Sequence, residues 1–531
     1  MVTWQYAVVP TTFQAPAGIT YQVLSQIHIP TDTYVAVETE AERLASIQDS
    51  IVCSSGGAVL AAGTVQPNVI PVCPEGYHWD YSDNLCAPNN CPTGYHWSGT
   101  ACVADQVSPP PPSADQAIPA GNITVTDFNL NTTPGVRNVR IVAKRWFKIE
   151  RSYTDNVGHF LFTKRFKHKV KIVVKFKNSY CNIRSIRGLQ LWQSLYVVRK
   201  TIGVYSGDKS NIPPYNFGWS ANTAKARSNG FWVAATTINA VQEHRDYSTT
   251  YGFTAAPLNL NIYISNLSSS LSSTPLFGKR YISNFPSSFA TTFLVNHISN
   301  EIPVLGPVVN WYVSFFATIA STRLDIAIGY NRTMDRFTSD FIKETVYHEL
   351  SHASHYAKLG NTWYNNLVMA ELAEIVAHPL PSDPLNPYGS GASATNSPII
   401  ALGEAWGYHM GHFLADQRYG TSASSQIEQP GNTFFTGGGA HPHIDVLEAF
   451  NPNLTSDPFN WIPKGLMEDL IDATNETNPI TDNVSGFTIS QLFNALQSDV
   501  TTLQLYRARI ISQNPSISTI NITNLFGQYH Y

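Results

Sequence analysis

The segment HELSH, from His348 to His352, contains the residues of this sequence with the clearest potential for chemistry. On a helix, two histidines four positions apart lie on one face and can bind the same ion. Zn²⁺ takes such nitrogen ligands at short distance, and a glutamate directly after the first histidine can accept a proton from metal-bound water. The spacing predicts a zinc site with His348 and His352 as ligands and Glu349 as the general base. The alternative is two surface histidines on an ordinary helix.

The residues around the motif predict a helix from Phe341 to Leu359, because this stretch contains no Gly or Pro. Thr338 or Ser339 can cap its start, and Gly360 can end it. One face of the helix is apolar and consists of Ile342, Val346, Leu350, Ala353 and Ala357. The histidines of the motif are expected on the opposite side, away from the core contact.

A catalytic zinc site also needs a third protein ligand and an open position for water. Glu404 occurs in a predicted helix, ALGEAWGYHMGHFLADQ, among small and apolar residues that leave room for a metal ion and make an unpaired carboxylate costly. Glu371, in NLVMAELAEIV, follows His352 after 18 residues, a separation used by aminopeptidase-type gluzincins. The spacing favours Glu371 and the context favours Glu404, which we predict to be the ligand. We expect His355 to support the site or to pack in the core.

Peptide hydrolysis also needs a hydrogen-bond donor for the oxyanion that develops on the substrate. The candidates near the motif and the predicted third ligand are Tyr408, His409, His412, His441 and His443. The sequence does not choose among them, since each could equally be a packing or surface residue. The stretch FFTGGGAHPH, from Phe434 to His443, is either a mobile lid or a surface loop.

The composition limits the class of protein. At 531 residues the chain is too long for one ordinary core, so several domains are expected. Charged residues are only 13% and aromatic residues 12%, which argues against a disordered or nucleic-acid-coating protein and favours an extracellular or virion surface protein. No window approaches the ~20 apolar residues of a transmembrane helix, and the first residues lack the features of a signal peptide. Export would then depend on a removed leader or on assembly into a phage particle.

Three segments precede the larger predicted domains. Residues 1–65 are expected to form a docking or assembly module, and residues 108–120 form a stiff Pro-rich linker. Residues 66–107 contain a tandem repeat, CPEGYHWDYSDNLC followed by CPTGYHWSGTAC. Units this small need cross-links, so the disulfides Cys73–Cys86 and Cys91–Cys102 and an oxidising environment are predicted.

The cysteines of the repeat also allow a different interpretation. Four residues could form a zinc knuckle, although their spacings fall outside the usual close Cys pairs. These residues are Cys73, His78, Cys91 and His96. Outside the repeat, Cys53 and Cys181 could pair or stay free.

Residues 121–205 predict a small β-sandwich, since VRIVAKRWFKI, HFLFTKRF and KVKIVVKFK are rich in β-branched and aromatic residues. The segment YTDNVG, from Tyr153 to Gly158, supplies Asp, Asn and Gly for a hairpin turn. Residues 137–200 hold 17 of the 33 Lys and Arg residues and only 2 acidic residues, a net charge of about +15. These cations either form a solvated face or bind a polyanionic surface such as acidic polysaccharide or lipid headgroups, with nucleic acid the least favoured partner.

Residues 206–531 mix predicted strands and helices and are expected to be the catalytic domain. RLDIAIGY, from Arg323 to Tyr330, predicts a strand before the motif helix. GLMEDLIDAT, TISQLFNALQSDV and LQLYRARIIS predict helices near the C-terminus. The predicted fold class is a multidomain α+β protein, in which an N-terminal module, a disulfide-rich repeat and a β-sandwich precede a mixed α/β metallopeptidase domain.

Three segments, HELSHASHY, GEAWGYHMG and NWIPKGLMEDLID, resemble a poorly characterised group of bacterial cell-surface or phage-borne zincin-like metallopeptidases. In that group a transthyretin-like or carboxypeptidase-regulatory-like sandwich often precedes the protease, and VRIVAKRWFKIERSYTDNVGHF is similar to it. The resemblance covers residues 121–531. It implies a gluzincin fold with His348 and His352 as ligands, Glu349 as the base and Glu404 as the third ligand.

The sequence therefore predicts a zinc-dependent peptidase that cleaves protein or peptide substrates outside the cell or on a virion. The main alternative is a structural or adhesive surface protein whose zincin domain is inactive. The presence of Glu349 argues against that alternative, because a structural ion needs ligands but no general base. A carbohydrate- or envelope-binding protein led by the basic sandwich is a further alternative.

Overall fold

The computed structural model divides the chain into two units, Met1–Pro110 and Pro111–Tyr531. The predicted module of residues 1–65 lies outside the described residues, as do the cysteine side chains of the repeat. The structure describes residues 77–80, 85–88, 95–97, 102–104, 118–186, 195–219, 227–265, 324–330, 338–378, 388, 391–424, 427–428, 434–435, 441–452, 460–473 and 479–531.

The first unit contains two short antiparallel hairpins, one in each copy of the tandem repeat. Strand β1 (Tyr77–Asp80) pairs with β2 (Leu85–Pro88), and β3 (Tyr95–Trp97) pairs with β4 (Cys102–Ala104). In each hairpin the tryptophan of the repeat lies opposite the second cysteine. The backbone thus repeats with the sequence, and the predicted disulfides and the zinc-knuckle alternative remain predictions.

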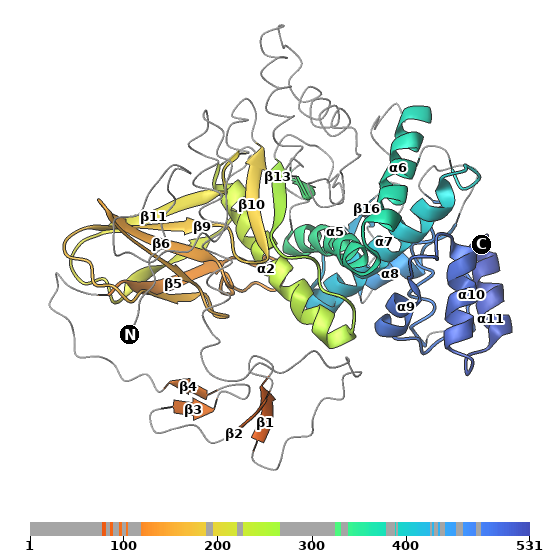
Figure 1. The fold of residues 1–531 in the computed structure, drawn as a ribbon, viewed down its shortest axis with the longest axis horizontal. Helices are drawn as coiled ribbons and strands as arrows, with labels where there is room; N and C mark the ends of the chain where they lie inside the picture. Colours follow the sequence, from red (N-terminus) through yellow and green to blue (C-terminus); the bar gives the residue numbers. More distant parts are fainter. Residues whose placement is uncertain are drawn as a thin grey trace, which may run out of the picture. The chain divides into compact units, whose positions relative to one another are not determined.

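The second unit begins with two facing β-sheets (Figure 1). The strand order is β11-β9-β6-β7 in one sheet and β12-β5-β8 in the other. In β5 alternate residues are buried, since Ile123 and Val125 are buried while Asn122 and Thr124 between them are only half-buried, because successive side chains point to opposite faces. The strands are β5 (Ala120–Val125), β6 (Arg140–Arg145), β7 (Lys148–Tyr153), β8 (His159–Leu161), β9 (Val170–Lys175), β11 (Arg199–Tyr205) and β12 (Ile212–Phe217).

The sequence predicts a hairpin turn from Tyr153 to Gly158, but this is wrong, because the strands on either side of it, β7 and β8, do not pair with each other. The segment does turn, and the Asp155 carboxylate accepts hydrogen bonds from the backbone N–H groups of Val157 and His159. However, β8 pairs with β5 in the other sheet, where the Phe160 side chain is fully buried. The turn chemistry is local, whereas burial of Phe160 decides which sheet takes the strand.

The strand pairing continues past the predicted boundary at residue 205. Strand β12 follows that boundary and pairs with β5. In the other direction, β10 (Cys181–Ile186) pairs in parallel with β13 (Leu260–Ser265), which pairs in parallel with β14 (Ile326–Gly329). Cys181 is buried in this sheet as a free thiol, and burial raises its pKa. Cys53 lies outside the described residues.

Helix α2 (Arg227–Tyr251) joins the sandwich to the rest of the second unit. The indole N–H of Trp232 donates to the carbonyl of Thr126, at 2.9 Å between nitrogen and oxygen. The amide oxygen of Asn239 accepts from the backbone N–H of Arg137, at 2.8 Å. These contacts fix one end of the sandwich on a buried helix.

The remaining helices include the predicted motif helix, α5 (Ser339–Leu359), which begins after Thr338 and ends at Gly360. Gly360 has φ of 78°, a left-handed conformation that glycine adopts without strain. The others are α6 (Asn361–Ala377), α7 (Ser397–Tyr419), α8 (Pro442–Glu448), α9 (Ile489–Ala495), α10 (Leu503–Gln513) and α11 (Thr519–Gln528). The described part of the chain is thus a mixed α+β structure, which confirms the coarse fold class; the separate predicted domains stay predictions.

Two predicted features near the C-terminus differ from the structure. The described part of GLMEDLIDAT, residues 465–473, contains turns instead of a helix. Its end is held by the backbone of a later segment, since the carbonyls of Leu470 and Ile471 accept from the N–H groups of Phe487 and Gly486. In FFTGGGAHPH, Phe434–Phe435 is strand β16, paired with β15 (Ile427–Glu428), and the glycines lie outside the described residues.

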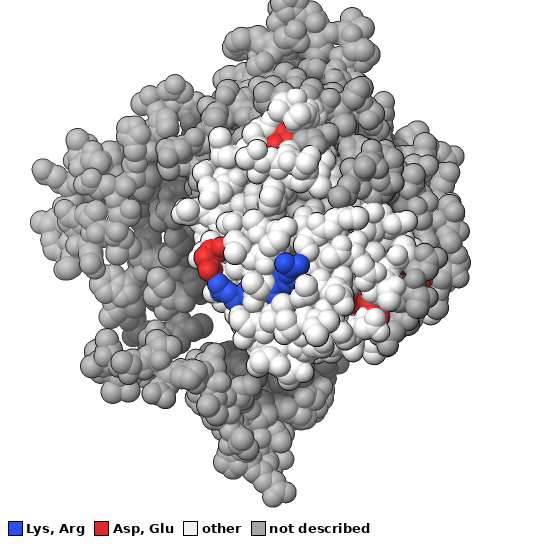
Figure 2. All heavy atoms as spheres, turned by 90° about the vertical axis from the view of Figure 1, so that its right-hand side faces the viewer, with Lys and Arg blue, Asp and Glu red and all other residues white. Residues whose placement is uncertain are grey.

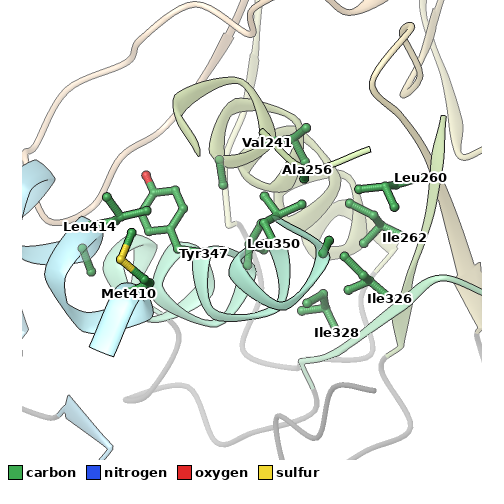
Figure 3. Close-up of a cluster of buried hydrophobic side chains, with 14 of the residues drawn as sticks. Val241, Ala256, Leu260, Ile262, Ile326, Ile328, Tyr347, Leu350, Met410 and Leu414 are labelled. Carbon is green, nitrogen blue, oxygen red and sulfur yellow. The ribbon is translucent and has the colours of Figure 1, made fainter. Parts of the chain in front are cut away.

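Helix α5 lies in the centre of the core (Figure 3). Leu350 points toward α2 and the strands β13 and β14, while Tyr347 points toward Met410 and Leu414 of α7. Ala357, expected in the apolar stripe, is exposed. All residues from Ser339 to His355 are buried. The histidine face is therefore also covered by other elements, whereas the sequence predicted that it lies away from the core contact.

Figure 2 shows the face on the side of α10 and α11, where few Lys, Arg, Asp or Glu side chains reach the surface. No helix among the described ranges combines the length and the apolar character that crossing a bilayer requires.

Candidate metal centre

Helices α5 and α7 bring three potential metal ligands together. The Nε2 atoms of His348 and His352 are 3.0 Å apart. Glu404, on α7, has one carboxylate oxygen 3.6 Å from His348 Nε2 and the other 3.6 Å from His352 Nε2. Within the described residues these are the three side chains that could jointly hold an ion.

The distances between these atoms fit a zinc ion. With ligand bonds of about 2.0–2.1 Å at tetrahedral angles, two ligand atoms lie roughly 3.3 Å apart. The observed separations of 3.0 and 3.6 Å lie on either side of that value. Two imidazoles and one carboxylate are also a donor set found in catalytic zinc sites. The residues present therefore fit the ion that the sequence predicts.

Glycines on α7 make room for the imidazoles. A Cβ atom on Gly407 would lie 2.5 Å from His352 Nε2 and 3.0 Å from His348 Cε1. A Cβ on Gly411 would lie 3.0 Å from the Cβ of His348. Contacts this short are not tolerated in close-packed interiors. One turn of α7 thus supplies the carboxylate of Glu404, and the glycines of the following turns leave the space for the two imidazole rings beside it.

The charges in the centre stabilise one another. Burial alone would raise the pKa of Glu404, but His352, His348 and a hydrogen bond from Tyr388 lower it to about 2. Burial lowers the pKa of His352 to about 4, against the effect of Glu404. For His348 burial also acts to lower the pKa, but the interactions with Glu404 and Glu349 outweigh it and raise the pKa. Near neutral pH, Glu404 is therefore ionised and His352 is neutral, as a metal site requires.

The motif histidines are also fixed from outside the three-residue cluster. The hydroxyl of Tyr364 donates to the carbonyl of His352, at 2.5 Å. The ring of Tyr408 lies edge-on to that of His348, with 4.7 Å between centroids. The Nζ of Lys464 lies 3.9 Å from the centroid of the Tyr408 ring. Among the contacts of the described residues, Tyr408 is thus the one predicted oxyanion donor that directly contacts a motif histidine.

The two other glutamates have different environments. Glu349 is buried, with a carboxylate oxygen 3.7 Å from His348 Nε2. Glu371, on α6, is also buried, and burial together with the negative charges of Glu404 and Glu349 raises its pKa well above the usual value. Glu371 therefore holds a proton more readily than an ordinary glutamate does. Its carboxyl group interacts electrostatically with Glu404 and Glu349, but it is not one of the three potential metal ligands.

The remaining predicted histidines lie in other contacts. His409 Nδ1 is 3.3 Å from the Glu468 carboxylate, and burial lowers the pKa of His409 to about 3. His412 and His443 lie beside each other, 3.5 Å apart between Nδ1 atoms. His441 contacts the Asp416 carboxylate at 3.0 Å.

His355 packs between aromatic rings. The imidazole centroid is 4.4 Å from the Trp363 ring and 5.6 Å from the Tyr364 ring. Burial lowers the pKa of His355 well below its usual value, so the ring stays neutral. Of the two roles expected for this residue, the observed contacts are those of a core residue.

Tyr388 also belongs to the centre, although no motif in the sequence points to it. Its hydroxyl hydrogen-bonds to Glu404, and its backbone carbonyl accepts from the indole N–H of Trp461, at 3.0 Å. Tyr388 occurs in the Pro- and Gly-rich segment DPLNPYGSG, before α7. A tyrosine in such a segment carries no local signal of a site, because only the folded chain brings it to Glu404.

Comparison with known proteins gives little further information. No protein-family model matches the chain, and no curated protein matches it. Among solved structures, a 9R-lipoxygenase from Cyanothece is similar at 12% sequence identity, over 29% of this chain and 27% of that chain, with a TM-score of 0.10. This similarity is too low to indicate a common fold.

Proposed function

We propose that this protein is a zinc-dependent metallopeptidase that hydrolyses peptide bonds in protein or peptide substrates. The observation that carries the proposal is the meeting of His348, His352 and Glu404 at distances that suit one Zn²⁺ ion, with the Glu349 carboxylate beside them. This combination is what a gluzincin-type site requires, and it agrees with the sequence resemblance. Activity outside the cell or on a virion surface belongs to the same proposal.

A Zn²⁺ ion bound at these residues would supply a water molecule of lowered pKa and polarise the scissile carbonyl. Glu349 would accept a proton from the attacking water and deliver it to the leaving amine. Tyr388, which hydrogen-bonds to Glu404, and Tyr408, whose ring contacts that of His348, are the candidates to stabilise the oxyanion. The raised pKa of Glu371 favours its protonated form, which would add no negative charge to the site.

A purely structural zinc site explains the observations less well. Such a site is closed by four protein ligands, whereas three potential ligands meet here among the described residues. It would also have no use for a buried carboxylate such as Glu349 next to a ligand. The cost of burying that carboxylate is better explained by proton transfer.

The experiment is cleavage of an unfolded protein substrate by the full chain, before and after chelation and after zinc is restored. We expect chelation to abolish cleavage and zinc to restore it. Glu349→Gln is expected to bind zinc normally and to lower turnover by several orders of magnitude, because only proton transfer is lost. Full activity of that variant, or cleavage that survives chelation, would refute the proposed mechanism.

A further inference from the structure

The turn between β6 and β7 exposes two aromatic side chains. Phe147 is 99% exposed and Trp146 is 87% exposed, the two highest values among large apolar side chains of the described residues. Trp146 has φ of 47°, in the left-handed region that hairpin turns usually assign to Gly or Asn. A bulky residue in this conformation costs free energy, and such strain is typical of functional positions. The hairpin therefore presents these rings at some cost to stability.

A groove of about 410 Å³ lies beside the two rings. Its lining consists of four cationic and three aromatic side chains and contains no acidic residue. The lining residues are Arg145, Trp146, Phe147, Lys148, Arg165, Phe166 and Lys167. The groove thus combines apolar surface with uncompensated positive charge.

Contacts between the two loops fix this groove. The guanidinium of Arg145 donates to the carbonyl of Lys167, at 2.5 Å. The ammonium of Lys148 donates to the carbonyl of Arg165 and lies 4.9 Å from the centroid of the Phe166 ring. Both cations use only part of their donor capacity in these bonds, so they remain able to bind an anion.

The nearest acidic side chain along β7 does not neutralise the groove. Glu150 is buried, and its carboxylate accepts hydrogen bonds from the backbone N–H groups of Thr163 and Lys164, at 2.7 and 3.0 Å. It therefore holds the 163–167 loop in place from the inside. The positive charge of the lining is left for an external partner.

We propose that this tip is a membrane-binding surface, which inserts Trp146 and Phe147 into the interface of a bilayer rich in anionic lipid. Tryptophan prefers the boundary between headgroups and acyl chains. Cationic side chains next to an anionic bilayer add electrostatic attraction, and stable peripheral binding needs both contributions. The groove beside the rings then takes a lipid phosphate. This inference does not depend on the metal centre.

An acidic polysaccharide fits the same charges but not the arrangement of the rings. A sugar polymer stacks on ring faces that follow one line along a groove. Trp146 and Phe147 are consecutive residues at the apex of a turn and are almost wholly exposed. They project outward from the sandwich, which suits insertion into a layer better than stacking along a chain.

The test is co-sedimentation of the full chain with vesicles of phosphatidylcholine, with and without phosphatidylglycerol. We expect binding only to the anionic vesicles and weaker binding as salt is raised. The double variant Trp146→Ser/Phe147→Ser should bind at least about tenfold more weakly. Arg165→Ser and Lys167→Ser should each weaken binding roughly fivefold, the effect of one cation near an anionic bilayer.

Two control variants change the same kinds of residue at the other end of the sandwich. Val157 is 70% exposed and follows β7, whose far end at Tyr153 lies about 17 Å along the strand from Lys148. Arg199 is exposed and lies opposite Lys175, at the end of β9 away from the tip. Val157→Ser and Arg199→Ser should bind vesicles as the unchanged protein does.

Three results would overturn the proposal. One is absence of binding to anionic vesicles, and another is equal loss in the tip variants and the two controls. The third is that binding to an acidic polysaccharide such as alginate requires Trp146, whereas binding to vesicles does not. Because the tip residues are exposed, the variants should fold normally, and an unchanged unfolding midpoint verifies this.

Discussion

The metal centre and the tip of the sandwich place their distinctive side chains in opposite environments. His352 is 1% exposed and Glu404 is 3% exposed, whereas Trp146 and Phe147 are almost fully exposed. Buried polar groups and exposed large apolar groups are the two departures from ordinary burial that indicate function. In the helical region the cost of burial is offset by pairing among the charges. At the tip nothing within the described chain covers the rings, which points to an external partner.

The largest expected effect is in the metal centre. Glu404→Ala should weaken zinc binding about a thousandfold or more, because it removes one of three ligands and leaves the others without their anionic partner. Glu371→Gln should change zinc affinity by less than about tenfold, since the raised pKa of Glu371 favours its protonated form and glutamine has nearly the same shape as that form. Competition with a zinc chelator of known affinity measures both. If Glu371→Gln loses zinc and Glu404→Ala keeps it, the ligand assignment is reversed.

The space that α7 leaves for the imidazoles gives the next effect. Gly407→Ala places a Cβ where the structure has the His352 ring, so zinc affinity should fall roughly 10- to 100-fold. Gly527→Ala, in α11, is the matched control because a Cβ there meets nothing within 4 Å. The control should keep zinc affinity and raise the free energy of unfolding by about 0.5–1 kcal/mol. Normal zinc binding by Gly407→Ala would show that the close approach of α7 is not needed.

Buried neutral histidines should make the helical region sensitive to acid. Burial, helped by Arg245, lowers the pKa of His244 to about 3, while the unfolded chain has a histidine pKa of about 6.5. As the pH falls from 6.5 toward 3, the unfolded chain binds a proton that the folded chain does not. The free energy of unfolding therefore decreases by about 1.4 kcal/mol per pH unit for this residue, and stability is retained above pH 6.5.

The variant His244→Phe should remove this contribution to the pH dependence of the free energy of unfolding, which urea unfolding at several pH values measures. Phe253 packs against the His244 ring, with 5.2 Å between centroids, so Phe253→Leu is the control. The control should lower the stability by a similar amount at every pH, because it changes packing without changing a titrating group. An unchanged slope in His244→Phe would mean that His244 takes up its proton at the same pH in the folded and the unfolded chain.

The smallest effect concerns the tip. Trp146→Gly relieves the left-handed backbone, so the free energy of unfolding should rise by about 0.5–1 kcal/mol. The same variant should bind anionic vesicles more weakly. The substitution would thus raise stability and reduce the proposed function. Thermal unfolding and co-sedimentation measure the two quantities. A loss of stability in this variant would show that the Trp146 side chain supports the fold.

Local patterns predicted the elements of the metal centre. The stretch without Gly or Pro predicted a helix over Phe341–Leu359, and α5 spans Ser339–Leu359. The mixed α+β fold class is confirmed, and the structure brings Glu404 rather than Glu371 to the motif histidines. That zinc binds there, and that Glu349 is the base, stay predictions.

Features that depend on distant residues could not be predicted in this way. Tyr388 reaches Glu404 only in the folded chain. The β6–β7 turn carries Trp146 and Phe147 in place of the usual turn residues, so its sequence gave no turn signal. The segment Tyr153 to Gly158 did carry that signal, but the strand after it joins the other sheet. In each case the tertiary contact outweighs the local preference.

The central claim is that zinc binds to His348, His352 and Glu404, and X-ray absorption at the zinc edge tests it most directly. The full chain, purified without chelator, should contain one zinc ion, and its ligands should be nitrogen and oxygen atoms at about 2.0–2.1 Å. Sulfur ligands at about 2.3 Å would place the ion in the cysteine repeat instead. That result, or protein that contains no zinc and takes none up, would contradict the account.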